Sequence, residues 1–153
     1  MTGTAGRRGE RVMGLDVGGK RIGVAVSDEL GLIATPVGFV TRGARDRDEL
    51  RKLVARWGVA RLVVGLPTGL SGREGPQAAE VRAFADALAA DLGLPLAYWD
   101  ERLTTAIAER ALIESGRRRE RRKEQIDAVA AAVMLQSYLD AEAGRRRRAA
   151  RQD

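Results

Sequence analysis

The sequence contains neither cysteine nor histidine among its 153 residues. Without cysteine the protein has no disulfides, no thiol nucleophile and no structural zinc site of the usual kind. Without histidine it lacks the commonest general base of enzymes and a frequent metal ligand. Any catalysis must therefore depend on carboxylates, on lysine, serine or threonine, or on a metal ion held by oxygen ligands.

Long apolar segments are also missing. No run approaches the roughly 20 residues that a membrane-spanning helix needs, and the beginning of the chain lacks the apolar segment of a signal peptide. We therefore expect a cytoplasmic protein without a membrane partner. A length of 153 residues fits one compact domain. We expect this domain at 12–140, between a disordered extension at 1–11 and a basic, disordered tail at 141–153.

Positive charge exceeds negative charge, giving a net charge of +6, and 24 of the 27 basic residues are arginine. Such a balance suits a polyanionic partner such as a nucleic acid, although a general bias toward arginine would produce it as well. Six of the seven residues at 117–123 are basic, and Arg145 to Arg148 form a second run. The first run fits a solvated linker and a phosphate contact equally well, whereas the second favours a solvated tail.

Hydrophobic periodicity predicts a meander of strands followed by alternating helices and strands. The first two strands are joined by Gly18-Gly19, as in a hairpin. The resulting fold class is α/β, with a five-stranded mixed sheet in which three antiparallel strands precede alternating α and β, and with helices on both faces. The expected strands are at about 11–18, 21–28, 32–40, 61–66 and 94–99, and the expected helices at 45–57, 76–92, 104–115 and 123–143.

Acidic residues stand in apolar surroundings in three segments. Asp16 interrupts an apolar strand, so it must lose water on folding and needs a positive partner, for which Mg²⁺ or Mn²⁺ is the leading candidate. Asp100 and Glu101 end another apolar strand, where α/β folds commonly build their sites, although a helix N-cap explains them equally well. Asp127 shares its helical stripe with apolar residues, which places it at the core and near Asp16. Stabilisation of the first helical turn is the alternative for Asp127.

A glycine-rich loop, TGLSGREG at 68–75, lies between an apolar strand and a helix. Its glycines, Gly72 among them, would let backbone N–H groups approach an anion at the start of the helix. A flexible connector is the alternative, and composition alone favours it slightly.

Together these segments resemble the YqgF/RuvX family, whose members have the RNase H fold. The resemblance covers roughly 12–140 and departs from the family at Gly69, where a polar residue is frequent. It rests on four segments in the family's order: GLDVGGKRIGVAVSD at 14–28, GLP at 65–67 with Gly72 and Gly75, DERLTT at 100–105, and IDAVAA at 126–131.

The resemblance implies a metal-dependent nuclease that cleaves phosphodiesters and processes the 5′ end of precursor 16S rRNA during ribosome biogenesis. Its catalytic acids would be Asp16, Asp100, Glu101 and Asp127. Asp16, Glu101 and Asp127 would hold two Mg²⁺ or Mn²⁺ ions, which can activate a water molecule and stabilise the departing oxygen.

The substrate-binding residues would be Lys20, Arg21, Gly72 and Arg102. The resemblance implies structured RNA or branched DNA as the partner, ribosomal proteins as further partners, and a monomer or homodimer. Two alternatives stay open at this stage: a Holliday-junction resolvase acting on DNA, and a non-catalytic nucleic-acid-binding module. The presence of every expected acid argues against the second.

Overall fold

The computed structural model describes residues 10–68, 73–103 and 119–152, without the side chains of Leu103, of 119–125 and of Gln152. The helix expected at 104–115 lies outside these residues. The elements are β1 (Arg11–Val17), β2 (Arg21–Ser27), β3 (Ala34–Thr41), α1 (Asp46–Trp57), β4 (Val59–Leu66), α2 (Pro76–Leu92), β5 (Leu96–Asp100), the short 3₁₀ helix η1 (Glu101–Leu103) and α4 (Arg119–Gln152).

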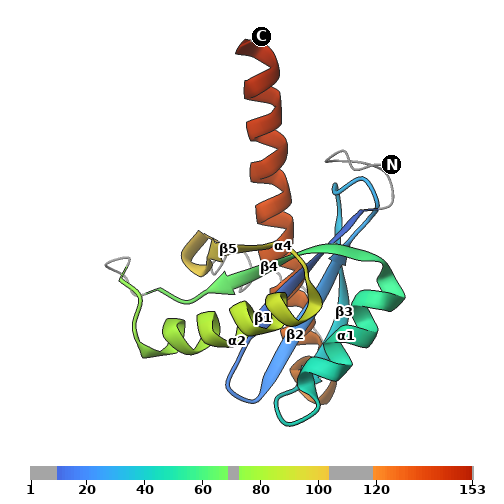
Figure 1. Ribbon diagram of the computed structural model, residues 1–153, viewed down its shortest axis with the longest axis vertical. Helices are drawn as coiled ribbons and strands as arrows, with labels where there is room; N and C mark the ends of the chain where they lie inside the picture. Colours follow the sequence, from blue (N-terminus) through green and yellow to red (C-terminus); the bar gives the residue numbers. More distant parts are fainter. Residues whose placement is uncertain (1–9, 69–72, 104–118, 153) are drawn as a thin grey trace.

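The five strands form one mixed sheet in the order β3-β2-β1-β4-β5 (Figure 1). β1 and β3 pair antiparallel with β2, whereas β1 pairs parallel with β4, and β4 pairs parallel with β5. The carboxyl ends of β1, β4 and β5 therefore meet at the same edge of the sheet. The predicted meander followed by alternating elements is confirmed.

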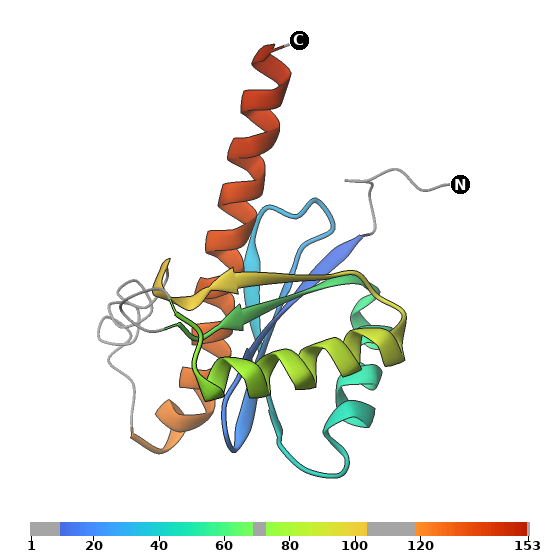
Figure 2. The ribbon, with the colours of Figure 1, turned by 60° about the vertical axis from the view of Figure 1, so that its left-hand side comes forward.

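Alternate residues of each strand face two separate apolar cores, as the two-residue period of a strand requires. On one face, Met13 and Leu15 of β1 belong to the core that α1 and α2 cover. On the other face, Val12 of β1 packs with Ala131 and Leu135 of α4. Figure 2 shows α1 and α2 on one side of the sheet and α4 on the other. Helices on both faces are thus confirmed.

Helix α4 approaches the sheet closely because the strands beneath it carry glycine. A Cβ atom added to Gly14 would lie 2.8 Å from the Cβ of Leu135, and one added to Gly23 would lie 1.9 Å from the carbonyl oxygen of Asp127. Both distances are shorter than a van der Waals contact, so a side chain at either position would push the helix away. The contact at Gly23 fixes where α4 meets β2.

The end of α4 corrects one expectation. We expected a disordered tail at 141–153, but α4 continues to Gln152, with 145–151 exposed. Arginine and alanine favour a helix even without packing, and Nη2 of Arg145 lies 2.5 Å from Oε2 of Glu142, three residues earlier. The domain limits at 12 and 140 stay a prediction. Among the described helices, α4 included, none is both long enough and apolar enough to span a membrane.

Candidate active site

Asp16 lies on β1 with its side chain on the face that α4 covers. Val12 packs in the core beneath α4 and Gly14 contacts it, and Asp16 follows at the same two-residue interval. In the sheet Asp16 pairs with Gly23 of β2. Because the backbone of Asp127 lies directly against Gly23, this register brings the start of α4 beside Asp16.

The acidity of Asp16 shows which carboxylates surround it. Burial, followed by the negative charges of Glu101 and Asp127, raises the pKa of Asp16 to about 6 from an ordinary value of 3.8. Like charges act on a partly buried carboxylate in this way only from nearby. The three acids, which come from β1, η1 and α4, therefore share one electrostatic environment.

The two adjacent acids at the end of β5 have different surroundings. Tyr98 of β5 packs with the core under α2, whereas Trp99 packs with the core under α4. Alternation puts Asp100, the last residue of β5, on the side of Tyr98. Glu101 begins η1, and its negative charge acts on Asp16. Burial, then the negative charge of Asp100, raises the pKa of Glu101.

Asp100 is held by protein groups. Nη2 of Arg102 donates to Oδ2 at 2.6 Å, the backbone N–H of Arg102 donates to Oδ1 at 3.0 Å, and Oγ1 of Thr68 donates to Oδ1 at 2.8 Å. These bonds, that of the Arg102 side chain above all, outweigh desolvation and hold the pKa of Asp100 well below its usual range. Asp100 therefore ties the loop after β4 to the turn after β5.

Arg21 supplies a positive charge beside the acids. Its Nε donates to Oδ2 of Asp127 at 2.5 Å, and the two side chains are 38% and 22% exposed. Its guanidinium carbon also lies 5.7 Å from the ring centroid of Phe39, which restricts the arginine further. Arg21 thus pairs with Asp127 and not with Asp16, whose pKa is raised.

The predicted substrate-binding residues separate into two groups. Arg21 and Arg102 each pair with an acid at this edge of the sheet. Lys20 is exposed in the turn between β1 and β2. Gly72 lies outside the described residues, and so do the side chains of the basic run at 117–123.

As they stand, the acids do not form a ready-made metal cage. Within the ranges that the structure describes, no three acidic side chains form a group that could hold an ion. The donors nevertheless suit a hard divalent cation, because only carboxylate oxygens are offered and Asp16 is destabilised by two like charges. An ion beside Asp16 would relieve that repulsion once Glu101 or Asp127 turned toward it.

Two polar residues of the first motif have structural roles. Oγ of Ser27 accepts a bond from the backbone N–H of Val12 at 2.9 Å. Oδ1 of Asp28 accepts the N–H groups of Leu32 and Ile33 at 2.7 and 2.9 Å. Desolvation opposes these bonds, but they lower the pKa of Asp28. The Asp28 turn is a common loop pattern.

The role of Thr68 had no signal in the sequence. Its bond to Asp100 joins residues 32 positions apart, and no spacing rule connects the ends of two parallel strands at that separation. Only the pairing of β4 with β5, in which Leu66 is opposite Asp100, brings the two loops together.

Residues 10–141 match the protein family described as "RuvX: Holliday junction resolvase". A protein of Moorella thermoacetica named "Putative pre-16S rRNA nuclease" is 53% identical over 132 residues, which cover 85% of this chain and 94% of the relative. A protein of the same name from Symbiobacterium thermophilum is 50% identical over 137 residues, covering 88% and 95% of the two chains.

Solved structures share the fold at low sequence identity. RuvC of T. thermophilus in complex with a Holliday junction substrate aligns with a TM-score of 0.55 and 16% identity, covering 86% of this chain and 96% of that one. The fowlpox virus Holliday junction resolvase aligns with a TM-score of 0.53 and 11% identity, covering 86% and 99%. These alignments show the resolvase type of RNase H-like fold, and the match over 10–141 together with the close relatives shows that this chain belongs to the RuvX family.

Proposed function

We propose that this chain is a metal-dependent nuclease that cleaves a phosphodiester bond of structured RNA, at the 5′ end of precursor 16S rRNA. The observation that carries the proposal is the cluster of Asp16, Glu101 and Asp127 on one face of the sheet, visible in the raised pKa of Asp16. The names of relatives with about half of their residues identical support the RNA substrate. A cytoplasmic location and contacts with ribosomal proteins fit this role.

In this proposal Asp16, Glu101 and Asp127 hold two divalent ions, Mg²⁺ or Mn²⁺. When bound, such ions activate a water molecule and stabilise the departing oxygen of an in-line displacement. The chain contributes carboxylates whose mutual repulsion favours a cation between them. It also contributes the buried wall of β1 and α4, which limits how far Asp16 can move.

Under this proposal Arg21 pairs first with Asp127 and, once metal is bound, with a phosphate of the substrate. It neutralises Asp127 in the metal-free protein, and a cation near Asp127 would release its guanidinium. A released guanidinium at the rim of the site can bind a phosphate through two parallel hydrogen bonds. The exposed ammonium of Lys20, the preceding residue, adds a second positive charge to the turn.

Asp100 is a positioning residue in this proposal and not a metal ligand. Its carboxylate already accepts bonds from Arg102 and Thr68, and its charge is stabilised without a metal ion. Its effect is to hold the first residues after β4 and β5 in place. Arg102 is consequently fixed by Asp100 and is less available to a phosphate than Arg21.

A junction-resolving DNA nuclease is the second candidate, because the family description names that activity. The same acids would serve both reactions, so the site does not distinguish them. A module that binds nucleic acid without cutting it is disfavoured. Three neighbouring carboxylates repel one another, and binding alone does not require them.

The test is cleavage of two substrates, a precursor rRNA 5′ fragment and a four-way DNA junction, with Mg²⁺ or Mn²⁺. Asp16→Asn, purified in parallel, controls for contaminating nucleases. We expect metal-dependent RNA cleavage that falls at least about 100-fold in the variant, because a neutral amide cannot neutralise a metal ion. Cleavage of the junction alone would favour the resolvase, and binding of both substrates without a metal-dependent cut would contradict a nuclease.

A further inference from the structure

The end of α4, residues 144–152, forms a basic helical arm. It contains Arg145, Arg146, Arg147, Arg148 and Arg151, and its described residues include no acid. Figures 1 and 2 show the arm standing clear of the sheet, with no other element beside it. The arm lies beyond residue 141, where the family match ends, so the properties of the family do not account for it.

The charges of the arm are largely unbalanced. Arg145 pairs with Glu142, and the described part of the chain provides no salt bridge for the other four arginines. All five are exposed, so none of them is needed to pack the core. Four arginines within six residues repel one another unless an anionic partner is present.

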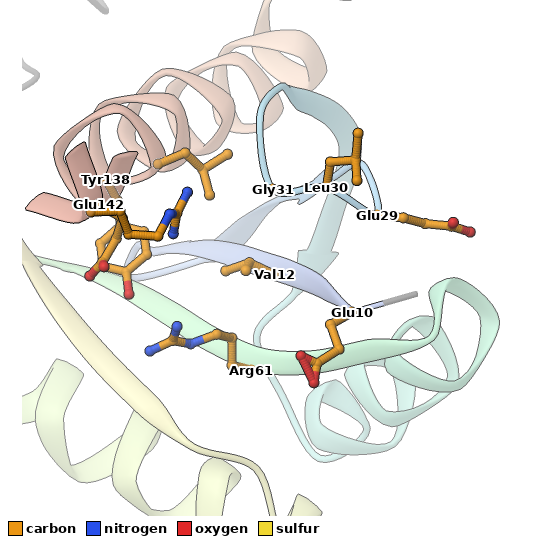
Figure 3. A pocket seen from close by; sticks show the side chains of 10 residues that line it. Glu10, Val12, Glu29, Leu30, Gly31, Arg61, Tyr138 and Glu142 are labelled. Atoms are coloured by element: carbon orange, nitrogen blue, oxygen red, sulfur yellow. The ribbon is translucent and has the colours of Figure 1, made fainter. Parts of the chain in front are cut away.

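Acidic residues outnumber basic ones in the pocket at the base of the arm. This pocket lies between the start of β1, the loop after β2, β4 and α4 (Figure 3). Two basic residues line it, Arg61 and Arg146, together with the acids Glu10, Glu29 and Glu142. An anion would therefore find little net attraction in the pocket. In this part of α4, the excess of positive charge begins beyond Glu142.

The arm and the acid cluster lie at opposite ends of α4. Arg148 follows Asp127 by 21 residues of one continuous helix. At a rise of 1.5 Å per residue the two positions are about 30 Å apart. A B-form duplex rises about 3.4 Å per base pair, so the interval equals about nine base pairs, and somewhat more in an A-form duplex. A ligand that reaches both positions must be an extended polyanion.

We propose that the arm binds the phosphate backbone of a duplex flank of the substrate, about 30 Å along α4 from Asp127. Arginine guanidinium groups bind phosphates without distinguishing the base sequence. Because only a flank long enough to reach the arm would contact it, the arm would recognise the length of the flank. The identity of the ligand rests on the proposed function, which this inference deepens. The substrate class becomes nucleic acid with a duplex longer than about ten base pairs beside the cleaved bond.

The test compares two variants with the same change in charge. The arm variant keeps Arg145 and its bond to Glu142, and glutamine preserves helix propensity. The control variant changes exposed residues of α1 and the residue that precedes this helix, on the opposite face of the sheet. The substitutions of the arm variant are Arg146→Gln, Arg147→Gln, Arg148→Gln and Arg151→Gln. Those of the control variant are Arg45→Gln, Arg47→Gln, Lys52→Gln and Arg56→Gln.

Binding is measured in EDTA with a duplex RNA of about 25 base pairs at several salt concentrations, which tests the arm without any cleavage. We expect the arm variant to lose at least about tenfold in affinity, and its slope of log K against log salt to become shallower by about 2 to 3. The control variant should lose less than about threefold. Replacement of the same four arginines by lysine should retain the affinity, because lysine keeps the charge. Equal losses in the arm and control variants would overturn the proposal.

Cleavage then tests the placement of the arm relative to the acids. On substrates with a duplex flank of about 6 base pairs, the arm variant should keep the wild-type kcat/KM, because the arm cannot be reached. On flanks of about 20 base pairs it should lose at least about fivefold. A loss that does not depend on flank length would contradict the 30 Å placement. If the wild type cleaves neither substrate, the proposed function fails, while the binding result still decides on the arm.

Discussion

Asp16 carries a negative charge that the folded protein stabilises poorly, and this has a consequence for stability. A carboxyl group whose pKa is higher in the folded state, here about 6 against 3.8, favours folding when protonated. Its favourable contribution is therefore present at low pH and is lost as pH rises from about 4 to above 6. The free energy of unfolding of the metal-free wild type should therefore fall over this pH interval. Replacement of Asp16 by asparagine should remove this part of the fall.

We predict that Asp16→Asn is more stable than the wild type at pH 8 in EDTA, by about 1 to 3 kcal/mol. The difference should shrink as pH falls toward 5, because the wild-type carboxyl group becomes neutral. Urea unfolding of both proteins at several pH values between 5 and 8 measures this difference. Parallel stability curves would show that Asp16 does not have the raised pKa.

Arg21 links the state of Asp127 to the binding of cations. We predict that Arg21→Gln binds Mn²⁺ more tightly than the wild type, since Asp127 no longer has a competing ion pair, and yet cleaves more slowly, since a phosphate contact is lost. Calorimetric titration and cleavage rates measure the two effects.

A suitable control is Arg51→Gln, which removes an arginine that pairs at the surface with Asp48 of α1 and Asp91 of α2. It should leave both the Mn²⁺ affinity and the cleavage rate unchanged. A fall in both quantities for Arg21→Gln would mean that Arg21 positions Asp127 and does not compete with the metal ion.

Single site residues could be predicted from the sequence where a charged side chain stands in an apolar segment. Asp16, Glu101 and Asp127 stand out because they are acids within apolar patterns, and the structure places them in one electrostatic environment. The sequence could not separate Asp100 from Glu101, because the direction of a side chain at the end of β5 depends on the sheet. Nor could it show the bond between Arg21 and Asp127, whose partners are 106 residues apart.

At the scale of elements, the contact of α4 with β2 determines whether the acids meet. We predict that Gly23→Ala destabilises the protein by at least about 2 kcal/mol, because its Cβ would lie 1.9 Å from the carbonyl oxygen of Asp127. The shift of α4 should also lower cleavage in whatever fraction still folds. Denaturant unfolding measures the first effect and cleavage per folded molecule the second.

Gly19→Ala is the matched control, because a Cβ at that position has nothing within 4 Å. It should change stability by less than about 0.5 kcal/mol. If Gly23→Ala were equally harmless, α4 could not be held where the structure places it, and the position of Asp127 beside Asp16 would lose its explanation.

Most elements could be predicted from hydrophobic periodicity, because their apolar residues face one of the two cores. The end of α4 could not. Its last residues face solvent and carry no apolar stripe, so hydrophobic periodicity does not indicate a helix there. The helix propensity of arginine and alanine is the remaining signal. The order of the strands also follows from the meander and the alternating units.

At the scale of the whole molecule, basic runs stand near both ends of α4, at 117–123 and at 145–148. The carboxylates that would bind metal ions gather toward the start of α4, close in sequence to the first run, and the exposed arginines of the arm stand at its end. The net charge of +6 attracts a polyanion, and the arm offers it a surface away from the acids. One helix thus connects the proposed cutting site with the proposed duplex contact.

The most direct measurement is the cleavage rate of the precursor rRNA fragment by Asp16→Asn, Glu101→Gln, Asp127→Asn and Asp100→Asn at saturating Mg²⁺. We predict that the first three lose at least about 100-fold. Asp100→Asn should stay within about tenfold of the wild type, because an amide still accepts the bond from Thr68 and keeps part of the loop contact. A dead Asp100→Asn beside an active Glu101→Gln would contradict the assignment of the metal site.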